Sequence, residues 1–358
     1  MNRASARLEG VPAVTSQCRI LSLLTPAICA AMIAAAPPGA TPSMQSPVRV
    51  ALGPDSSLFV SDYGRRKVFT IDRDSLVIVD EFTVAGRPTG IAFDGEYVLV
   101  GNETTGRVEI FCPDGVYVGA FATVFQQPND IAVSTRLGLV FVASTQAGTV
   151  DVFTLDGMPV RTIPASGQEP LAYPTSVALY ELPLAGDANG DDVVNVLDFL
   201  AVLAAWHQIG GPEDVDGDGV VDIGDFLMVL ANWGALPEPS EVLVADFGDV
   251  TQSIDAAVRI YDDLGVHLQT ISGQFSRPQG LVGIGNGLVF VVDSLLGQVL
   301  VIDRATDQTV RTLGEFGTEP GQLILPLDVV IEPDSSDVFV TNNQSARIEV
   351  FPQGGLPP

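Results

Sequence analysis

The stretch GRPTGIAFDGEYVLVGNETTGRVEIF, residues 86–111, contains the pattern that decides the fold. Within it, a proline is followed by two residues, an aliphatic residue and then alanine or valine. The same pattern starts at Pro47, Pro88, Pro128, Pro174, Pro278 and Pro326, at intervals of 41, 40, 46, 104 and 48 residues. A self-similar period in the forties indicates stacked units, and β-rich units of this length are typical of propeller blades.

The rest of each unit also repeats. An aliphatic strand follows the proline strand and ends in a small polar residue, and a third, alternating strand comes next. The polar residues are Asp62, Asn102, Ser144, Asp246, Asp293 and Asn342. A fourth, outer strand is visible in most units, such as VIVDEFTV at 77–84. Strands buried on both faces by neighbouring units account for the high apolar content.

These motifs resemble the NHL repeat, whose pattern runs P-x-G-I-A-V-D, V-Y-V-A-D and R-V-Q-V-F. The stretches GRPTGIAFD at 86–94 and EVLVADFG at 241–248 are close matches. The resemblance covers about residues 46–351, apart from one acidic stretch, and implies an all-β fold, a six-bladed NHL-type β-propeller. The last unit has no outer strand after RIEVFPQGGLPP. The ring therefore closes either with a three-stranded blade or with residues before Pro47.

Composition narrows the classes of partner. The 358 residues include 17 Lys and Arg against 44 Asp and Glu, which gives a formal net charge of −27. This charge repels phosphate backbones and anionic lipid, so nucleic acid is not expected as a partner, whereas divalent cations are. The mean hydropathy of +0.32 and the 36 glycines and 25 prolines indicate many short buried strands joined by tight turns.

The first 40 residues have the features of a signal peptide followed by a tether. Arg3, Arg7 and Arg19 precede an apolar run at 20–36, which ends in alanines. A membrane anchor is the alternative, but the run is short for a span and Pro26 interrupts it. We expect a secreted protein, extracellular or periplasmic, without membrane insertion once the leader is removed. Cys18 and Cys29 lie in this leader, so we expect Cys112 to be a buried apolar residue without a disulfide.

The interval of 104 residues in the fourth unit is about 55 residues longer than a normal blade. This indicates an inserted module at 184–239, flanked by Pro183, Pro237 and Pro239 as stiff spacers. Blades 1–3 and the first strand of blade 4 then occupy 46–183, and the rest of the propeller occupies 240–358. The module lies between the first and second strands of its blade. We expect it on the face opposite the second-to-third-strand loops, which usually line the binding funnel.

The module contains two copies of one loop–helix motif, which include DFLAVLAAW and DFLMVLANW. Oxygen-bearing residues occupy loop positions 1, 3, 5, 9 and 12, the spacing of an EF-hand calcium loop, and position 7 offers its carbonyl. The first loop provides Asp187, Asn189, Asp191, Val193, Asn195 and Asp198. The second loop provides Asp214, Asp216, Asp218, Val220, Asp222 and Asp225. The spacing predicts two Ca²⁺ ions; the alternative is a pair of solvated acidic turns.

The second loop is expected to bind calcium more tightly than the first. It has five candidate carboxylates against three, and Gly219 stands at position 6, where the first loop has Asp192. Each loop leads into a helix with apolar residues at helical spacing. These are Phe199, Val202, Leu203 and Trp206, and then Phe226, Val229, Leu230 and Trp233. We expect them to pack between the helices, although either tryptophan could instead contact a partner.

The duplicated loop–helix, residues 186–234, resembles a type I dockerin. The resemblance implies a small all-α, dockerin-like calcium-binding module in blade 4, with two structural calcium ions and a cohesin-like partner. Cellulosomal dockerins commonly have hydroxyl residues at loop positions 10 and 11, with basic residues further along the helix. Here those positions are Val196-Leu197 and Ile223-Gly224, and the module has no Lys or Arg. This difference from cellulosomal dockerins affects the expected specificity for a partner, but it does not affect the predicted calcium ligands.

The sequence favours an exported calcium-binding adaptor over an enzyme, and no residue is assigned a catalytic role. The dockerin-like module would dock to a cohesin-like partner, and the propeller face would recognise a protein, peptide or glycan. The alternative is a propeller lyase or glycan-active hydrolase associated with polysaccharide degradation, acting through Asp62, Asp246 or Asp293. The chain has only His207 and His267, too few for a multi-histidine zinc site. In a third interpretation, the module is an internal clip without a partner.

Overall fold

The computed structural model describes residues 43–181, 184–191, 193–235, 240–285, 287–333 and 335–352. The predicted leader at 1–40 and the spacers Pro183, Pro237 and Pro239 lie outside the described residues. Within the described ranges, no helix is long and apolar enough to cross a membrane.

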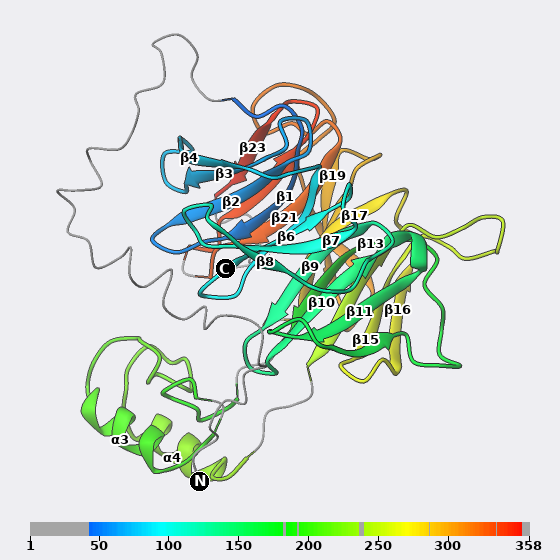
Figure 1. Cartoon of the computed structure of the whole chain (residues 1–358). Coiled ribbons are helices and arrows are strands. Elements are labelled where there is room, and N and C mark those ends of the chain that lie inside the picture. Colours follow the sequence, from blue (N-terminus) through cyan, green and yellow to red (C-terminus); the bar gives the residue numbers. More distant parts are fainter. Residues whose placement is uncertain are drawn as a thin grey trace.

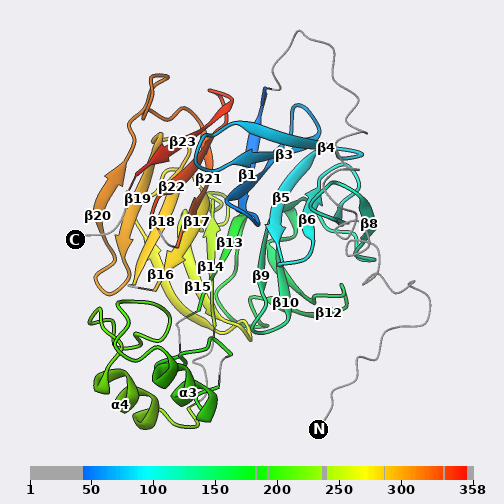
Figure 2. The same cartoon turned by 90° about the vertical axis from the view of Figure 1, so that its left-hand side faces the viewer.

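Six antiparallel sheets are arranged as the blades of a propeller around one axis (Figures 1 and 2). Blade 1 comprises β1 (Pro47–Leu52), β2 (Ser57–Asp62), β3 (Lys67–Asp72) and β4 (Ile78–Thr83). Blade 2 comprises β5 (Pro88–Phe93), β6 (Val98–Asn102), β7 (Arg107–Phe111) and β8 (Tyr117–Ala120). Blade 3 comprises β9 (Pro128–Ser134), β10 (Leu139–Ser144), β11 (Thr149–Thr154) and β12 (Pro159–Ile163), with the short 3₁₀ helix η2 (Thr145–Ala147).

The second half of the ring continues this order. Blade 4 comprises β13 (Pro174–Tyr180), β14 (Glu241–Asp246), β15 (Ala257–Asp262) and β16 (His267–Ser272). Blade 5 comprises β17 (Pro278–Ile284), β18 (Leu288–Asp293), β19 (Gln298–Asp303) and β20 (Gln308–Leu313). Blade 6 comprises β21 (Pro326–Ile331), β22 (Val338–Asn342) and β23 (Arg347–Phe351). The predicted six-bladed β-propeller is therefore confirmed.

Every innermost strand begins at the proline of the repeat. Proline has no amide hydrogen for the strand ladder, so it is tolerated at the first position of a strand. In each blade the pairing register shifts just after this proline, as between Pro47 and Arg49 in blade 1. A bulge of this kind locally re-aims a side chain. The third residue of each repeat therefore lies at the bulge of an innermost strand, where the bulge sets its direction.

The hydrophobic core is divided into six clusters, and each joins two neighbouring blades. The cluster between blades 4 and 5, for example, contains Leu243 and Ile260 of one blade and Val289 and Val291 of the next, all fully buried. Burial on both faces of a sheet explains why the strands are almost continuously apolar. Because the clusters form a closed ring, each blade is held by both of its neighbours.

The ring closes with a three-stranded blade 6, the first of the two alternatives left by the sequence. A cluster that includes Val50 and Leu58 of blade 1 and Phe339 of blade 6 fills the closing interface. Asn343 Nδ2 also donates to the carbonyl oxygen of Pro47 at 3.0 Å. No strand from the described residues before Pro47 joins blade 6.

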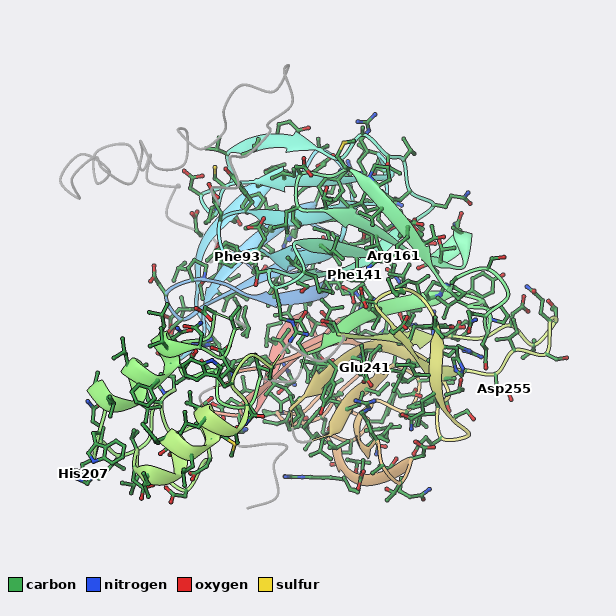
Figure 3. All side chains as sticks on the ribbon, turned by 90° about the horizontal axis from the view of Figure 1, so that it is seen from below. Phe93, Phe141, Arg161, His207, Glu241 and Asp255 are labelled. Carbon is green, nitrogen blue, oxygen red and sulfur yellow. The ribbon has the colours of Figure 1, made fainter. Side chains whose placement is uncertain are left out.

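The segment between β13 and β14 contains the two helices α3 (Val196–Ala204) and α4 (Ile223–Ala231). Figures 1 and 2 show both helices in a lobe outside the ring of sheets. Tyr180 and Glu241 are direct partners across β13 and β14, so the segment leaves and re-enters the blade at neighbouring points. In Figure 3, His207 of this lobe and Asp255 of blade 4 lie at opposite sides of the molecule.

Polar contacts join the residues that flank this segment to blade 3. Ser240 Oγ donates to Glu181 Oε1 at 3.0 Å, which joins the two ends of the segment. Ser134 Oγ donates to the same carboxylate oxygen at 2.5 Å, and Arg136 Nη2 donates to Ser240 Oγ at 2.7 Å. The two residues that flank the segment, Glu181 and Ser240, are thus joined to each other and to blade 3.

Cys112 is 4% exposed, so its predicted burial is confirmed. The expectation that it has no disulfide is wrong, because Cys112 is disulfide-bonded in the structure.

Candidate functional site

The first predicted calcium loop brings three carboxylates together. Oxygens of Asp187, Asp191 and Asp198, at loop positions 1, 5 and 12, all lie within 4.8 Å of one another. Asp198 is fully buried, and its two oxygens accept the amides of Asn189 at 3.2 Å and Asn195 at 2.8 Å. A buried carboxylate held in this way is fixed before any ion binds. The loop could therefore hold a metal ion.

The second loop repeats this arrangement with more carboxylates. Oxygens of Asp214, Asp216 and Asp218, at positions 1, 3 and 5, lie within 4.8 Å of one another. Asp225 at position 12 is fully buried, and it accepts the amides of Asp216 at 3.1 Å and Asp222 at 2.7 Å. Position 12 therefore has the same hydrogen bonds in the two loops. The three carboxylates that lie within 4.8 Å of one another differ: they occupy positions 1, 5 and 12 in the first loop and positions 1, 3 and 5 in the second.

Charge crowding and an unpaired oxygen give the second loop a set of groups that could hold a cation. The amide of Asp218 acts to lower the pKa of Asp216, but burial and nearby carboxylates outweigh it, so the pKa is raised. The neighbouring carboxylates are Asp225, Asp218 and Asp214. Asp214 Oδ1 is buried and has no hydrogen-bond partner among the described residues. Hard oxygen donors with excess negative charge are the set that Ca²⁺ prefers, so these residues fit the ion.

The backbone at position 6 agrees with the sequence prediction where it can be described. Gly219 has φ of +97°, a conformation that costs glycine least. Asp192, at the same position of the first loop, lies outside the described residues.

Position 9 has a structural role that sequence reasoning missed. Asn195 and Asp222 are the N-caps of α3 and α4, and they accept the amides of Leu197 at 2.8 Å and Gly224 at 2.6 Å. In each helix the position-12 aspartate completes a capping box with the N-cap amide. The signal was present in the sequence as Asn or Asp three residues before Asp. The same side chains therefore start the helix and shape the loop.

The remaining loop residues lie at the surface around the carboxylates. Asn189 Oδ1 accepts the amide of Asp191 at 2.9 Å. The Val193 carbonyl, predicted as a ligand, accepts Asn195 Nδ2 at 2.8 Å, so a metal would compete with this bond. Val220 forms an isolated β-bridge with Ile209, which joins the second loop to the linker between the helices.

The two helices pack together less extensively than their periodicity predicts. Phe199 and Phe226 meet with ring centroids 4.5 Å apart, and Val202 and Val229 are fully buried. Trp206 packs against this core. The predicted core members Leu203, Leu230 and Trp233 are instead 45%, 47% and 51% exposed. Two short helices have no further layer to cover these side chains, which explains the error.

A set of exposed apolar side chains, here called the apolar helix face, results from this packing. Its members are Val196, Leu197, Leu200, Leu203, Ile223, Leu227, Leu230 and Trp233, each between 45% and 57% exposed. Most occupy matching positions of the two helices, such as Leu200 and Leu227. Large apolar side chains left exposed in number on one small element are typical of protein-binding sites.

The six polar residues that end the second strands are fully buried. Asp293 is typical: it accepts the amides of Ser276 at 2.6 Å and Leu296 at 3.0 Å, which belong to the two turns beside it. Asp62 and Asp246 accept amides in the same manner. Their buried carboxylates cap turns, and this hydrogen bonding gives no support to the catalytic role considered for these three aspartates.

A buried arginine closes the propeller axis. Arg49 of β1 is 1% exposed and donates to main-chain oxygens of four other blades. These are the carbonyls of Asn129 at 3.1 Å, Gln279 at 3.0 Å and Leu327 at 3.0 Å, and that of Thr175. Its guanidinium also lies 3.7 Å from Asp130 and 3.3 Å from Asp328. Sequence reasoning assigned this residue no role.

The two axial aspartates share this one positive charge. Burial raises the pKa of both carboxyls, and that of Asp328 to about 7, against the opposing effect of Arg49. Next to this layer the inner strands line an open cavity of about 430 Å³, whose walls combine aliphatic side chains with Asp130 and Asp328. Tyr180 and Glu181 line it, so it opens on the face that bears the lobe. The module lies at the end of blade 4 opposite its second-to-third-strand loop, where the sequence predicted it, whereas this axial cavity opens on the same face as the module.

No family model matches the chain, and no curated protein sequence matches it. Among solved structures, a gluconolactonase, XC5397 from Xanthomonas campestris, is 14% identical with a TM-score of 0.54, and the match covers 87% of each chain. A hydrazine synthase from Kuenenia stuttgartiensis is 14% identical with a TM-score of 0.53, over 89% of this chain and 99% of the other. At such identity the likeness shows the propeller fold alone.

Proposed function

We propose that the chain is an exported calcium-binding interaction protein. Residues 184–239 would bind two Ca²⁺ ions and dock, as a dockerin-like module, to a cohesin-like partner, while the NHL-type propeller recognises a protein, peptide or glycan. One observation carries the proposal: carboxylates converge within 4.8 Å in each of two matching loops, each followed by a helix. Calcium binding would neutralise the repulsion among these carboxylates and so stabilise the lobe.

The docking part of the proposal is supported by the apolar helix face. Val196, Leu197 and Ile223 occupy loop positions 10 and 11 and are more than half exposed. A partner can recognise these side chains only through apolar contacts. Because α3 and α4 begin at Asn195 and Asp222 inside the calcium loops, ion binding would also fix the direction of this face.

Calorimetric titration of the full secreted chain with calcium tests the metal sites. We expect two ions per chain. The double substitution Asp187→Asn with Asp191→Asn should remove the weaker one, and Asp214→Asn with Asp216→Asn the tighter one, because each removes ligand charge from one loop only. Asp74→Asn, an exposed carboxylate outside both loops, is the matched control and should bind both ions. Unchanged stoichiometry in the loop variants would contradict the proposal.

Calcium-dependent capture from the secreted fraction tests docking. A partner should bind the immobilised chain in calcium, be released by chelator, and fail to bind the double variant Leu200→Glu with Leu227→Glu, which keeps the loops intact. A partner retained by that variant would bind elsewhere. Equal capture with and without chelator would favour the clip interpretation.

A second candidate is a propeller hydrolase or lyase, favoured by the fold shared with a gluconolactonase. A screen of lactones, glycans and amidated peptides would detect turnover, and the adaptor hypothesis expects none.

A further inference from the structure

Blade 4 departs from the repeat at the end opposite the lobe. Ten residues, 247–256, connect β14 to β15, whereas four residues connect the second and third strands of every other blade. Those short loops are 63–66, 103–106, 145–148, 294–297 and 343–346. Six copies of one unit provide an internal comparison, and the five short loops show that the propeller unit folds without a ten-residue connection.

The same blade has an arginine where no other blade has one. Arg259 of β15 occupies the register position held elsewhere by Phe69, Glu109, Asp151, Leu300 and Glu349. It is 4% exposed, and Nη1 donates to Asp246 at 2.8 Å while Nη2 donates to the Asp255 carbonyl at 3.2 Å. These two bonds fix the guanidinium below the long loop.

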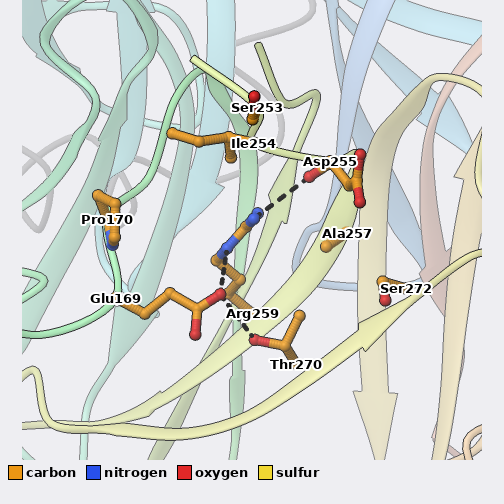
Figure 4. Close-up of a pocket in the computed structure, with 9 residues that line it drawn as sticks. All are labelled: Glu169, Pro170, Ser253, Ile254, Asp255, Ala257, Arg259, Thr270 and Ser272. Atoms are coloured by element: carbon orange, nitrogen blue, oxygen red, sulfur yellow. Dashed lines mark hydrogen bonds and ion pairs between the residues drawn. The ribbon is translucent and has the colours of Figure 1, made fainter. Parts of the chain in front are cut away.

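Arg259 lies at the centre of a pocket of about 240 Å³ (Figure 4). Its Nε is buried and has no hydrogen-bond partner among the described residues, although Glu169 Oε1 is 3.4 Å away. Three hydroxyls also line the pocket: those of Ser253, Thr270 and Ser272. The carboxylates of Glu169 and Asp255 complete its polar lining. The pocket thus offers both hydrogen-bond donors and acceptors in a small space.

The long loop is built to keep its shape without a ligand. Asp249 and Ile254 exchange both main-chain hydrogen bonds, at 2.7 and 3.0 Å, and Asp249 also accepts the amide of Thr251. Gly248 has φ of +77°, and a Cβ there would lie 2.6 Å from the main chain of Asp255. Glycine is therefore required for the loop to fold back on itself. The wall of the pocket that carries Ser253 is preformed.

Charge and size limit what the pocket can accept. The acidic lining disfavours an anion, and the buried guanidinium disfavours a cation. The volume equals that of about eight water molecules, at about 30 Å³ each, and is below the 300–1,000 Å³ typical of drug-sized sites. A compact neutral molecule with several hydroxyl groups can satisfy guanidinium, carboxylate and hydroxyl groups together.

We propose that this blade 4 pocket binds a neutral polyhydroxylated ring, such as one monosaccharide unit. The ligand would accept from Arg259 Nε, contact the Thr270 hydroxyl and donate to Glu169, whose side chain is 41% exposed. In the structure Thr270 Oγ1 donates to Glu169 Oε1 at 3.4 Å and lies 2.7 Å from His267 Nε2, so the ligand would share these groups with His267. This inference rests on the recognition role proposed for the propeller and names its ligand class. It does not depend on the calcium loops, which lie at the other end of the blade.

Blade 5 supplies the substitution that tests the pocket. There, Leu300 stands at the position of Arg259, and the buried Asp293 is satisfied by main-chain amides alone. Arg259→Leu therefore copies an arrangement that this fold already contains, and Asp246 keeps the amides of Ala172 and Tyr173. Thr270→Val removes one lining hydroxyl. Thr312→Val is its matched control, because Thr312 has the same register position in blade 5.

Saturation-transfer NMR and calorimetry of the full chain, with glucose, galactose and xylose as neutral probes, measure the binding. Citrate and putrescine serve as anionic and cationic probes. We expect a neutral sugar to bind with a dissociation constant on the order of 1 mM. Arg259→Leu should weaken binding at least tenfold and Thr270→Val several-fold, while Thr312→Val should leave it unchanged.

Adding a chelator distinguishes this inference from the calcium proposal, because removal of calcium should leave sugar binding unchanged. Three outcomes would overturn the inference. They are failure of all neutral probes to bind, wild-type affinity in both the Arg259→Leu and Thr270→Val variants, and binding of citrate or putrescine alone. Failure of the calcium titration would not affect it. A sugar-binding chain without a cohesin-like partner would contradict only the docking proposal.

Discussion

At the scale of single residues, Arg49 shows how a repeat acquires one specialised member. It is the third residue of its repeat, and the equivalent residues are Gly90, Asp130, Ser176, Gly280 and Asp328. A Cβ on Gly90 would lie 2.9 Å from the Asp130 main chain, and one on Gly280 would lie 2.6 Å from that of Asp328. The small members leave space on the axis, and the acidic members balance the charge of the one long side chain that fills it.

The raised pKa of Asp328 predicts a dependence of stability on pH. Its folded-state pKa of about 7 lies above the ordinary value of about 3.9, so the folded chain keeps a proton that the unfolded chain loses. The associated stability is complete below about pH 4 and is lost as the pH rises through about 7. Asp328→Asn removes this titration. Over that window its free energy of unfolding should rise relative to wild type by up to about 1.4 kcal/mol per pH unit.

Urea unfolding of both proteins between about pH 4 and pH 8 measures the difference. Asp74→Asn, an exposed carboxylate, is the control and should follow the wild type. Parallel pH profiles for wild type and Asp328→Asn would show that the axial carboxyl does not titrate in this range.

At the scale of elements, the sequence predicted the repeated strands well, but it predicted less well which residues of the two helices are buried. Each inner strand starts at its proline, since the missing amide allows only a few places in a sheet. The acidic residues converge as their loop spacing predicts. Helical periodicity, however, gave Trp206 and Trp233 the same role, whereas only Trp206 packs in the core. Periodicity defines an apolar face, but tertiary contacts decide which part of it is covered.

Contacts between residues far apart in the chain also could not be predicted from the sequence. Arg49 reaches Gln279 across a separation of 230 residues, and no local pattern specifies that pairing. Arg259 and the long loop were visible in the aligned repeats, but their meeting with Glu169 depends on the connection between blades 3 and 4.

A glycine in the second calcium loop provides a prediction at this scale. Gly219 has φ of +97°, so Gly219→Ala should strain position 6 by about 1–2 kcal/mol. Since the ion binds only the correctly folded loop, calcium affinity at that site should fall about tenfold, while the first site keeps its affinity. Calorimetric titration resolves the two sites. Gly285→Ala, in a turn of blade 5 with open space around a Cβ, is the control. Equal loss at both sites would mean that the loops fold as one unit.

At the scale of the whole molecule, blade 4 carries the specialised features of an otherwise regular ring. The lobe leaves one end of the blade beside the axial cavity, and the ten-residue loop covers a pocket at the other end. Among the described residues, the cluster that fills the lobe and the clusters that fill the ring have no member in common. The two cores are separate, so we expect each to form without the other.

Excision of the lobe tests this independence. Tyr180 and Glu241 face each other directly, so replacing residues 181–240 with Asn-Gly should join β13 and β14 in a two-residue hairpin. The shortened chain should keep the thermal transition of the propeller, because its six inter-blade clusters are intact, and should lose its response to calcium. Scanning calorimetry with and without calcium measures both properties. Asp198→Asn with Asp225→Asn, which retains the lobe but alters position 12 of each loop, should likewise keep the propeller transition. Loss of that transition on excision alone would mean that the contacts of Glu181 and Ser240 with blade 3 make the lobe an integral clip of the ring.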